Sequence, residues 1–199
     1  MVVEILYRIG KEEDSYKIAE GIELASGGIV NFLFHGLLGE YTPAQVMENL
    51  LRKKSNNDSY ENAIVAEFEG NIIGIVYSYP AKFHGISEET RSYFPHDRLV
   101  FLADFFNSRV ENSWFLDSIY VDEKFRGEGI GSKLIELTKL KAKENGFNQL
   151  SLMVMADNLP ARITYERNHF KEVKYVDIKE HKLIPHKGGV YLLVSDLDI

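Results

Sequence analysis

The segment best suited to chemistry runs from Leu116 to Gly131 and reads LDSIYVDEKFRGEGIG. It begins as an apolar run typical of a strand covered on both faces, and glycines then stand at Gly127, Gly129 and Gly131. Glycines let the backbone approach a ligand closely. The helix predicted next, to about Asn145, begins with unpaired N–H groups and the positive end of its dipole. This arrangement predicts a site for an anion, typically a phosphate.

Two familiar glycine-rich loops fit this segment poorly. A P-loop has lysine directly after its last glycine, whereas here Ser132 stands between Gly131 and Lys133. A dinucleotide-binding turn follows its strand at once and has glycine at the position of Ser132, whereas here residues 122–125 intervene. A nucleotide-binding enzyme of another type therefore stays only as a weaker alternative.

Asp117 is the candidate general base, because it interrupts the apolar residues of the strand predicted over 114–121. Strict alternation places it on one face with Phe115, Ile119 and Val121. Direct proton transfer from an alkylammonium to an ordinary carboxylate costs about 8 kcal/mol. The role therefore requires burial or a water chain that relays the proton, and a structural carboxylate bonded to the backbone or to a basic neighbour stays open as the alternative.

Composition excludes several classes of protein. The chain has no cysteine, which removes disulfides, thiolate-bound zinc, iron–sulfur clusters and a cysteine nucleophile. Its histidines lack metal-binding spacing, so no metal is expected. A net charge of −7 favours neither nucleic acid nor an anionic membrane as a partner. Because the chain shows no signal peptide and no apolar run of about 20 residues, we expect a cytoplasmic protein.

The third interpretation of the glycine loop is the pattern R-x-x-G-x-G, which Arg126, Gly129 and Gly131 satisfy. In this the chain resembles the GNAT superfamily of acetyl-CoA-dependent N-acetyltransferases. The resemblance implies that backbone amides of the loop hold the pyrophosphate of coenzyme A and that the preceding strand pairs with its pantetheine arm. The cofactor-binding residues implied in this segment are Ile119, Tyr120, Val121, Arg126, Gly127, Glu128, Gly129, Ile130, Gly131 and Ser132.

A second pattern of the same family, N-x-x-A-x-x-x-Y-x-x-x-G-F, lies further along the chain. Asn158, Ala161, Tyr165 and Phe170 fall in its register, and His169 replaces the glycine. That departure affects the turn after the helix predicted over 159–168. It does not affect any residue with an assigned role. The specific resemblance covers roughly residues 114–175, whereas residues 1–112 agree only in the order of their elements.

The resemblance also implies roles for the residues of the second pattern. Asn158 hydrogen-bonds the pantetheine arm, although asparagine is also a common helix N-cap. Ala161 and Tyr165 belong with it to the implied cofactor-binding residues. Tyr165 donates a proton or a hydrogen bond to the departing thiolate. Full transfer between an ordinary tyrosine and an ordinary thiol is about 2 kcal/mol uphill, so the gain comes either from the hydrogen bond or from a lowered tyrosine pKa. Packing in the core is the alternative interpretation of Tyr165.

The reaction implied is direct attack of a primary amine on the thioester through a tetrahedral intermediate. Asp117 and Tyr165 are then the catalytic residues, and the amide of Val121 stabilises the oxyanion. The acceptor is a small molecule or a peptide whose identity the sequence leaves open. A homodimer is one of the expected states, because members of the family often dimerise. A module that senses acyl-CoA without catalysis is the other function that stays open.

Around these residues the sequence predicts one domain over 1–199 that mixes α and β structure, with 45% hydrophobic residues as in globular proteins. Strands are predicted at 2–9, 63–68, 72–79, 114–121, 150–155, 170–178 and 190–194, and further helices at 12–25, 42–54 and 98–108. Gly70-Asn71 predicts a hairpin turn. The resemblance implies a central mixed, mostly antiparallel twisted sheet of about six or seven strands with helices on both faces. Residues 80–112 are interpreted as an inserted helical segment.

Overall fold

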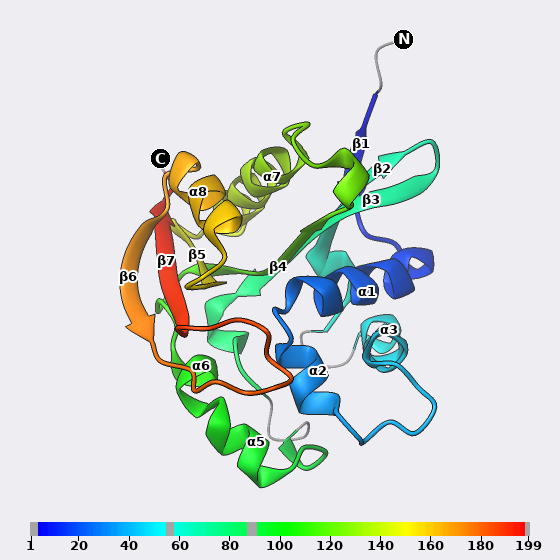
Figure 1. The fold of residues 1–199 in the computed structure, drawn as a ribbon. Helices are drawn as coiled ribbons and strands as arrows, with labels where there is room; N and C mark the ends of the chain where they lie inside the picture. The colour runs from blue at the N-terminus through cyan, green and yellow to red at the C-terminus, as the bar shows by residue number, and fades with distance from the viewer. Residues whose placement is uncertain (1–3, 55–57, 87–90, 198–199) are drawn as a thin grey trace.

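The apolar runs of the sequence form the strands of one mixed sheet in the computed structural model, which describes residues 4–54, 58–86 and 91–197 (Figure 1). The strands lie in the order β1-β2-β3-β4-β5-β7-β6. Their bounds are β1 (Leu6–Ile9), β2 (Ala63–Phe68), β3 (Asn71–Pro80), β4 (Trp114–Val121), β5 (Gln149–Met155), β6 (Lys171–Val176) and β7 (Val190–Asp196). Among the strands of these described ranges, only β4 and β5 pair in parallel. The predicted mixed, mostly antiparallel sheet is confirmed.

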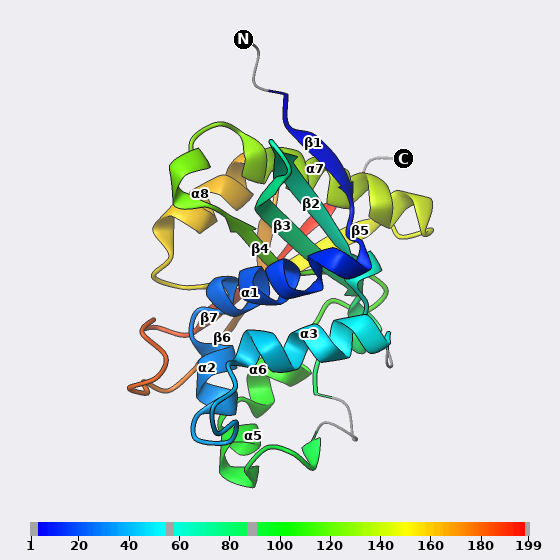
Figure 2. The same ribbon diagram turned by 90° about the vertical axis from the view of Figure 1, so that its right-hand side faces the viewer.

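Helices cover both faces of this sheet. On one face lie α7 (Ile130–Glu144) and α8 (Leu159–Arg167). On the other, α1 (Ser15–Ala25) and α3 (Pro43–Lys53) lie side by side (Figure 2). Two apolar clusters of buried side chains, one under each helix pair, hold the layers together. The sheet therefore separates two environments, and β3 and β4 contribute side chains to both.

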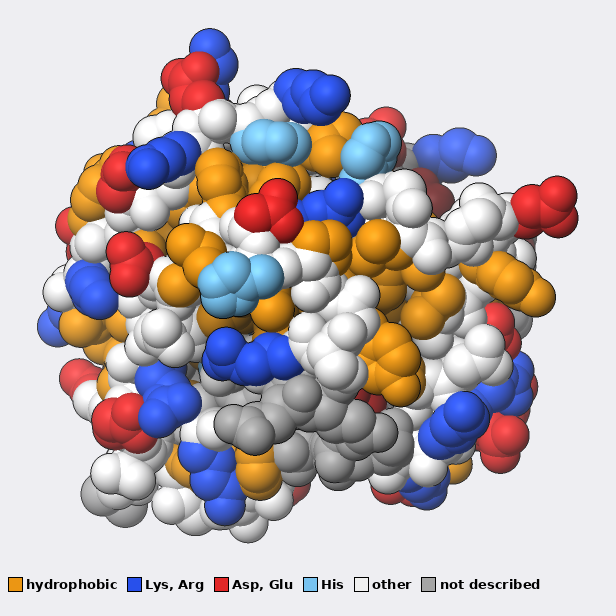
Figure 3. All heavy atoms as spheres, turned by 90° about the horizontal axis from the view of Figure 1, so that it is seen from below, with side chains coloured by type: hydrophobic (Ala, Val, Ile, Leu, Met, Phe, Trp, Pro, Cys, Tyr) orange, Lys and Arg blue, Asp and Glu red, His pale blue; other side chains and the backbone are white. Residues whose placement is uncertain are grey.

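A third apolar cluster closes the end of the molecule beneath β5, β6 and β7. It contains residues of α2 (Ile29–Phe34) and contacts from α5 (His96–Phe101) and α6 (Ala103–Asn107). The connection from β6 to β7 packs into the same cluster through Ile178 and Ile184. Figure 3 views the molecule from this end and shows acidic and basic side chains interspersed with apolar ones. No patch of a single charge sign dominates that view.

Capping explains why α3 begins where the sequence predicts. Thr42 Oγ1 accepts a hydrogen bond from the amide of Gln45 (3.3 Å), and Gln45 Oε1 accepts one from the amide of Thr42 (2.8 Å). Pro43 occupies the first turn, where its missing N–H costs nothing. This helix forms one wall of the pocket described below.

Several elements differ in extent from their predictions. β1 begins at Leu6, and residues 2 and 3 of the predicted strand lie outside the described residues. The helix predicted over 12–25 is a 3-10 turn, η1 (Glu12–Asp14), followed by α1. The helix predicted over 98–108 is α5 and α6, which meet at Leu102, and α2 was not predicted. These short helices depend on tertiary packing more than on local propensity.

The hairpin between β2 and β3 turns one residue earlier than predicted. Glu69 and Gly70 have φ values of 49° and 77°, and Phe68 pairs with Asn71. Two successive residues with positive φ are typical of the type I′ turn, whose twist matches that of the strands. Glu69 adopts this conformation although it is not a glycine.

His169 also adopts a left-handed conformation, with φ of 66°, in the turn after α8. Its amide donates to Glu166 O (2.9 Å), and the amide of Phe170 donates to Tyr165 O (3.0 Å). Such helix ends favour glycine, which is the residue that the family pattern has here.

We therefore expect His169→Gly to increase the free energy of unfolding by about 1 kcal/mol. The midpoint of thermal unfolding, followed by circular dichroism, should rise by about 2–4 °C. His169→Ala removes the same exposed side chain without relieving the backbone, so it should give no gain. A glycine variant no more stable than the alanine variant would contradict this explanation.

Candidate functional site

The two central strands separate soon after they begin. β4 pairs with β5 only where Trp114–Leu116 lie against Leu150–Leu152. Beyond these residues β4 continues along β3 as far as Val121, and β5 continues along β7 as far as Met155. The edges of β4 and β5 that face each other there have no strand partner within the described chain. Such edges can pair with an extended polar ligand as a sheet edge pairs with a peptide.

The orientation of the β4 backbone follows from one hydrogen bond. The amide of Asp122 donates to Ile73 O (2.8 Å) on β3. Because successive residues of a strand direct their N–H and C=O groups to opposite edges, those of Ile119 and Val121 are directed toward β5. Arg126 confirms this side, since its Nε donates to Val121 O (3.1 Å). Ile119 and Val121, two of the three residues predicted to pair with pantetheine, therefore present free amides at the open edge, whereas the backbone of Tyr120 is directed toward β3.

The loop after β4 carries a row of further unpaired amides. In the described chain the amides of residues 127–132 donate no hydrogen bond, and no side chain caps α7. Gly127 and Gly129 have φ values of 88° and 79°, and a Cβ added to either would meet no atom within 4 Å. These glycines are therefore required by backbone conformation, and the space around them is open. The loop fits a pyrophosphate, which accepts hydrogen bonds from amides and is attracted by the helix dipole.

Asn158 serves as the N-cap of α8. Its Oδ1 accepts a hydrogen bond from the amide of Ala161 (3.3 Å), while its Nδ2 donates to no described residue. Both interpretations of this residue are thus compatible, because one end of the side chain caps the helix and the other end is free to donate to a ligand.

Tyr165 lies in the apolar cluster beneath α7 and α8. Its exposed fraction is 6%, and its ring contacts Phe170 at 5.7 Å between centroids. The hydroxyl makes no hydrogen bond within the described chain, and burial raises the pKa of Tyr165 well above its ordinary value. The phenol therefore stays protonated at neutral pH. Of the two ways in which Tyr165 was expected to act, donation of a hydrogen bond is the one compatible with this environment.

One cluster brings the two sequence patterns together. Ile119 and Val121 of β4, Ile130 of α7, and Ala161 and Tyr165 of α8 pack in the same apolar core. Tyr120 differs, because its side chain packs on the opposite face with the residues of α1 and α3. Glu128 and Ser132 are exposed at the loop. The predicted donor-site residues thus gather around the end of β4.

Strict alternation predicted that Asp117 shares a face with Ile119 and Val121. This prediction is wrong, because β4 contains a bulge. Leu116 and Ser118 both pair with residues of β3, but Asp117 between them has no partner. One extra residue reverses the alternation beyond it. Ile119 and Val121 therefore pack beneath α7, while Asp117 lines a pocket on the other face of the sheet.

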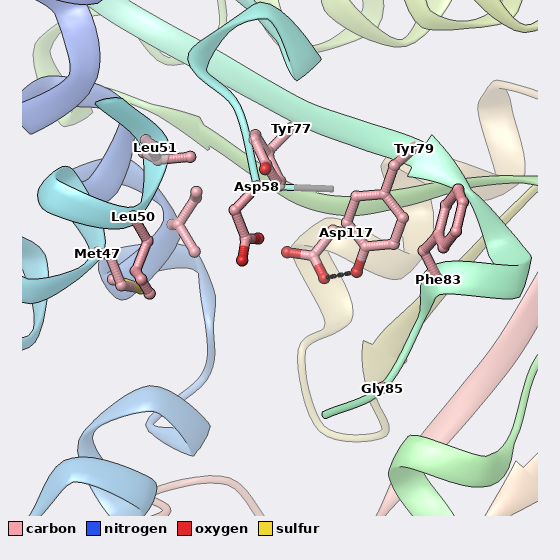
Figure 4. A pocket seen from close by; sticks show the side chains of 10 residues that line it. Met47, Leu50, Leu51, Asp58, Tyr77, Tyr79, Phe83, Gly85 and Asp117 are labelled. Atoms are coloured by element: carbon pink, nitrogen blue, oxygen red, sulfur yellow. Dashed lines mark hydrogen bonds between the residues drawn. The ribbon is translucent and has the colours of Figure 1, made fainter. Parts of the chain in front are cut away.

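This pocket has a volume of about 160 Å³ and lies between α1, α3, β3 and β4 (Figure 4). Phe115 lies on the same side as Asp117, as predicted, with its ring centroid 5.9 Å from that of Tyr79. The lining residues are Ile22, Met47, Leu50, Leu51, Asp58, Tyr77, Tyr79, Phe83, Gly85 and Asp117. Sequence reasoning missed all of these except Asp117. They come from segments far apart in the chain, so no local pattern joins them.

Two hydroxyl groups orient the carboxylate of Asp117. Tyr79 Oη donates to Oδ1 (2.6 Å), and Ser118 Oγ donates to Oδ2 (2.8 Å). Burial, together with the charge of Asp117, raises the pKa of Tyr79 well above its ordinary value. Tyr79 therefore remains a donor, and the carboxylate is fixed at the edge of the pocket. This is the position from which a carboxylate can bind an ammonium group or direct a water molecule.

Within the described ranges no group of three or more histidine, aspartate or glutamate residues is placed to hold a metal ion. In the same ranges, no helix has the length and apolar character needed to cross a bilayer.

Comparisons with known proteins agree with this geometry. Residues 32–170 match the family model of the acetyltransferase (GNAT) family, so the chain belongs to that family. The predicted family resemblance is thereby confirmed. Membership supports an acyltransferase that uses acetyl-CoA. No curated protein matches the chain at the level of sequence.

Solved structures reproduce the fold over nearly the whole chain. An acetyltransferase of known crystal structure has 27% sequence identity to this chain and a TM-score of 0.69. The alignment covers 97% of this chain and 100% of that chain. An N-acetyltransferase from Staphylococcus aureus Mu50 is 18% identical, with a TM-score of 0.68 and coverage of 95% and 99%. The PaiA N-acetyltransferase from Thermoplasma acidophilum, solved in complex with coenzyme A, is 15% identical, with a TM-score of 0.54 and coverage of 97% and 99%.

Proposed function

We propose that this protein transfers the acetyl group of acetyl-CoA to a primary amine by direct attack of the amine on the thioester. The observation that carries the proposal is the position of β4 between a donor half-site, formed by backbone amides, and an acceptor half-site, formed by the pocket at Asp117. Its free edge and the amides that follow it suit the donor, and Asp117 at its bulge lines a pocket suited to an acceptor.

The donor half-site binds through the backbone. The amides of residues 127–132 hold the pyrophosphate, and the free amides of Ile119 and Val121 hydrogen-bond the pantetheine arm and the thioester oxygen. Asn158 Nδ2 donates to the same arm. Arg126, whose Nε donates to Val121 O, stands in the same loop, and we expect its guanidinium to contact a phosphate of the bound donor.

In the acceptor half-site, Asp117 binds the substrate as an ammonium ion. The amine must lose a proton before it attacks, and direct transfer to an ordinary carboxylate costs about 8 kcal/mol. Asp117 therefore acts through a water molecule that carries the proton toward solvent. The C–N bond then forms, and the nitrogen gives up its second proton to the same water as the C–S bond breaks. Tyr165 donates a hydrogen bond to the departing thiolate, which takes up a proton from solvent to become the free thiol.

The double role of Asn158 gives a separable prediction. Asn158→Asp keeps an oxygen that caps α8 but removes the free amide donor, so we expect unchanged thermal stability and roughly tenfold weaker binding of acetyl-CoA. Asn158→Ser also caps the helix but adds no charge, so it controls for the charge of the aspartate variant. It should show the same unchanged stability and the same weaker binding of acetyl-CoA. Asn158→Ala should lose about 1 kcal/mol of stability as well. Calorimetric titration and thermal unfolding measure the two effects, and full affinity in the aspartate and serine variants would exclude the pantetheine contact.

The proposed function is tested first by calorimetric titration with acetyl-CoA, with NAD and ATP as controls on the same preparation. We expect micromolar binding of acetyl-CoA alone. Binding of NAD or ATP instead would indicate a nucleotide-binding enzyme of another type. Binding of acetyl-CoA without acetylation of any amine in a broad panel would favour the sensing module, and no binding would overturn the donor site.

A further inference from the structure

The pocket contains a second carboxylate that no described side chain neutralises. Asp58, in the segment between α3 and β2, points toward Asp117 across the pocket (Figure 4). Among the described residues Asp58 makes no hydrogen bond and no ion pair, and none of the described lining residues is basic. Burial and the charge of Asp117 both raise the pKa of Asp58. Two like charges that face each other in this way are stabilised by a cation between or beside them.

The rest of the lining defines the body of that cation. Met47, Leu50 and Leu51 of α3 and Ile22 of α1 form an apolar wall suited to methylene groups. A cavity of about 150 Å³ accommodates a benzene ring, so a pocket of about 160 Å³ holds a ligand of similar size. The pocket therefore suits a short aliphatic chain.

The charged residues among the described lining of the pocket are Asp58 and Asp117. The face in Figure 3, by contrast, mixes acidic and basic side chains. Tyr77, which also lines the pocket, has its hydroxyl engaged as the acceptor for the amide of Ser59 (3.3 Å). That bond ties Ser59, the residue after Asp58, to β3, so it keeps Asp58 at the pocket.

From this juxtaposition we propose that the acceptor is a short aliphatic diamine, with its reacting amine at Asp117, its distal ammonium at Asp58 and its methylene groups against the α3 wall. The proposal rests on the proposed function and names its substrate class. A distal carboxylate on the acceptor would face Asp58 without a basic partner, so amino acids are poor substrates of this site.

Three compounds of nearly equal length test the distal charge. The first is 1,4-diaminobutane. In n-pentylamine a methyl group replaces its distal ammonium, and in 5-aminopentanoate a carboxylate replaces it. Direct binding is measured by calorimetry on protein saturated with coenzyme A, and on the free protein if coenzyme A does not bind. We expect 1,4-diaminobutane to bind at least tenfold more tightly than n-pentylamine, and 5-aminopentanoate to bind more weakly than either.

Two variants assign the preference to Asp58. Asp58→Asn should bind 1,4-diaminobutane and n-pentylamine equally. Glu61→Gln, which removes a neighbouring charge that pairs with Lys54 outside the pocket, should keep the full preference. The raised pKa of Asp58 means that its ionisation opposes folding as the pH rises through that pKa. Asp58→Asn should therefore unfold at a higher temperature than the parent protein at pH 7, which also shows that it folds.

The outcomes separate this proposal from the proposed function. Equal binding of the three compounds, or a preference that survives in Asp58→Asn, overturns the diamine proposal even if some amine is acetylated. A preference that depends on Asp58, with no acetylation of any amine, supports the cation site and overturns the acetyltransferase reaction.

Discussion

Replacing Asp117 by asparagine is expected to lower kcat/KM for the amine acceptor by roughly 100-fold or more. Asparagine is similar in size and keeps an oxygen for the hydroxyl of Tyr79, but it has no charge to hold the ammonium and is a poor base. The affinity for acetyl-CoA should not change, because we propose that the donor binds through backbone amides at the free edge of β4 and in the loop after it, and not through the side chain of Asp117. Steady-state kinetics with the acceptor varied at saturating acetyl-CoA measures the effect.

Stability provides the control for this variant. Asp117 faces Asp58, whose pKa it helps to raise, so loss of its charge relieves repulsion and should not destabilise the fold. Tyr79→Phe removes one hydrogen bond to the same carboxylate and leaves the charge, so a reduction of about tenfold or less is expected. If Asp117→Asn retains activity within a few fold of the parent protein, Asp117 is a structural carboxylate and another group accepts the proton.

Tyr165→Phe is expected to lower kcat by roughly 100-fold, as loss of one donor to a developing anion does in other active sites. The KM for acetyl-CoA should change little, because the hydrogen bond forms as the C–S bond breaks. Since the hydroxyl has no partner in the described chain, its removal breaks no internal hydrogen bond, and thermal stability should be unchanged or slightly higher.

The alternative role of Tyr165 makes an opposite prediction. If the residue only packs in the core, phenylalanine keeps the ring contact with Phe170 and kcat should not fall. Tyr165→Ala should lose about 3–5 kcal/mol of stability in either case, so only the phenylalanine variant separates the two roles. A phenylalanine variant with full kcat would remove Tyr165 from the chemistry.

The local geometry of the proposed donor half-site could be predicted from the sequence because its signals are local. Gly127 and Gly129 stand between a buried strand and a helix whose first turn contains Gly131, and unpaired amides follow from that order alone. The spacing of Asn158, Ala161 and Tyr165 is likewise set by one helix. These residues need no information from distant parts of the chain, and the structure gathers them around the end of β4.

The acceptor half could not be predicted in the same way. Alternation indicates which face a residue takes only while a strand is regular, and the bulge at Asp117 leaves no mark in the hydrophobic pattern. Asp58 lies in a polar segment typical of loops, and it approaches Asp117 only because α3 packs beside α1 over β3. The pairing of Tyr79 with Asp117 depends on the register of β3 against β4. Such contacts are properties of the tertiary fold.

The most direct test of the account is to mix the protein with acetyl-CoA and a set of primary amines and to follow both products together. Because the chain has no cysteine, a thiol reagent detects only the coenzyme A that is released. We predict that free thiol and N-acetylated amine appear in equal amounts and that the mass of the protein stays unchanged. Acetyl-CoA that binds but releases no thiol with any amine, or an acetyl group that remains on the protein, would contradict direct transfer at β4.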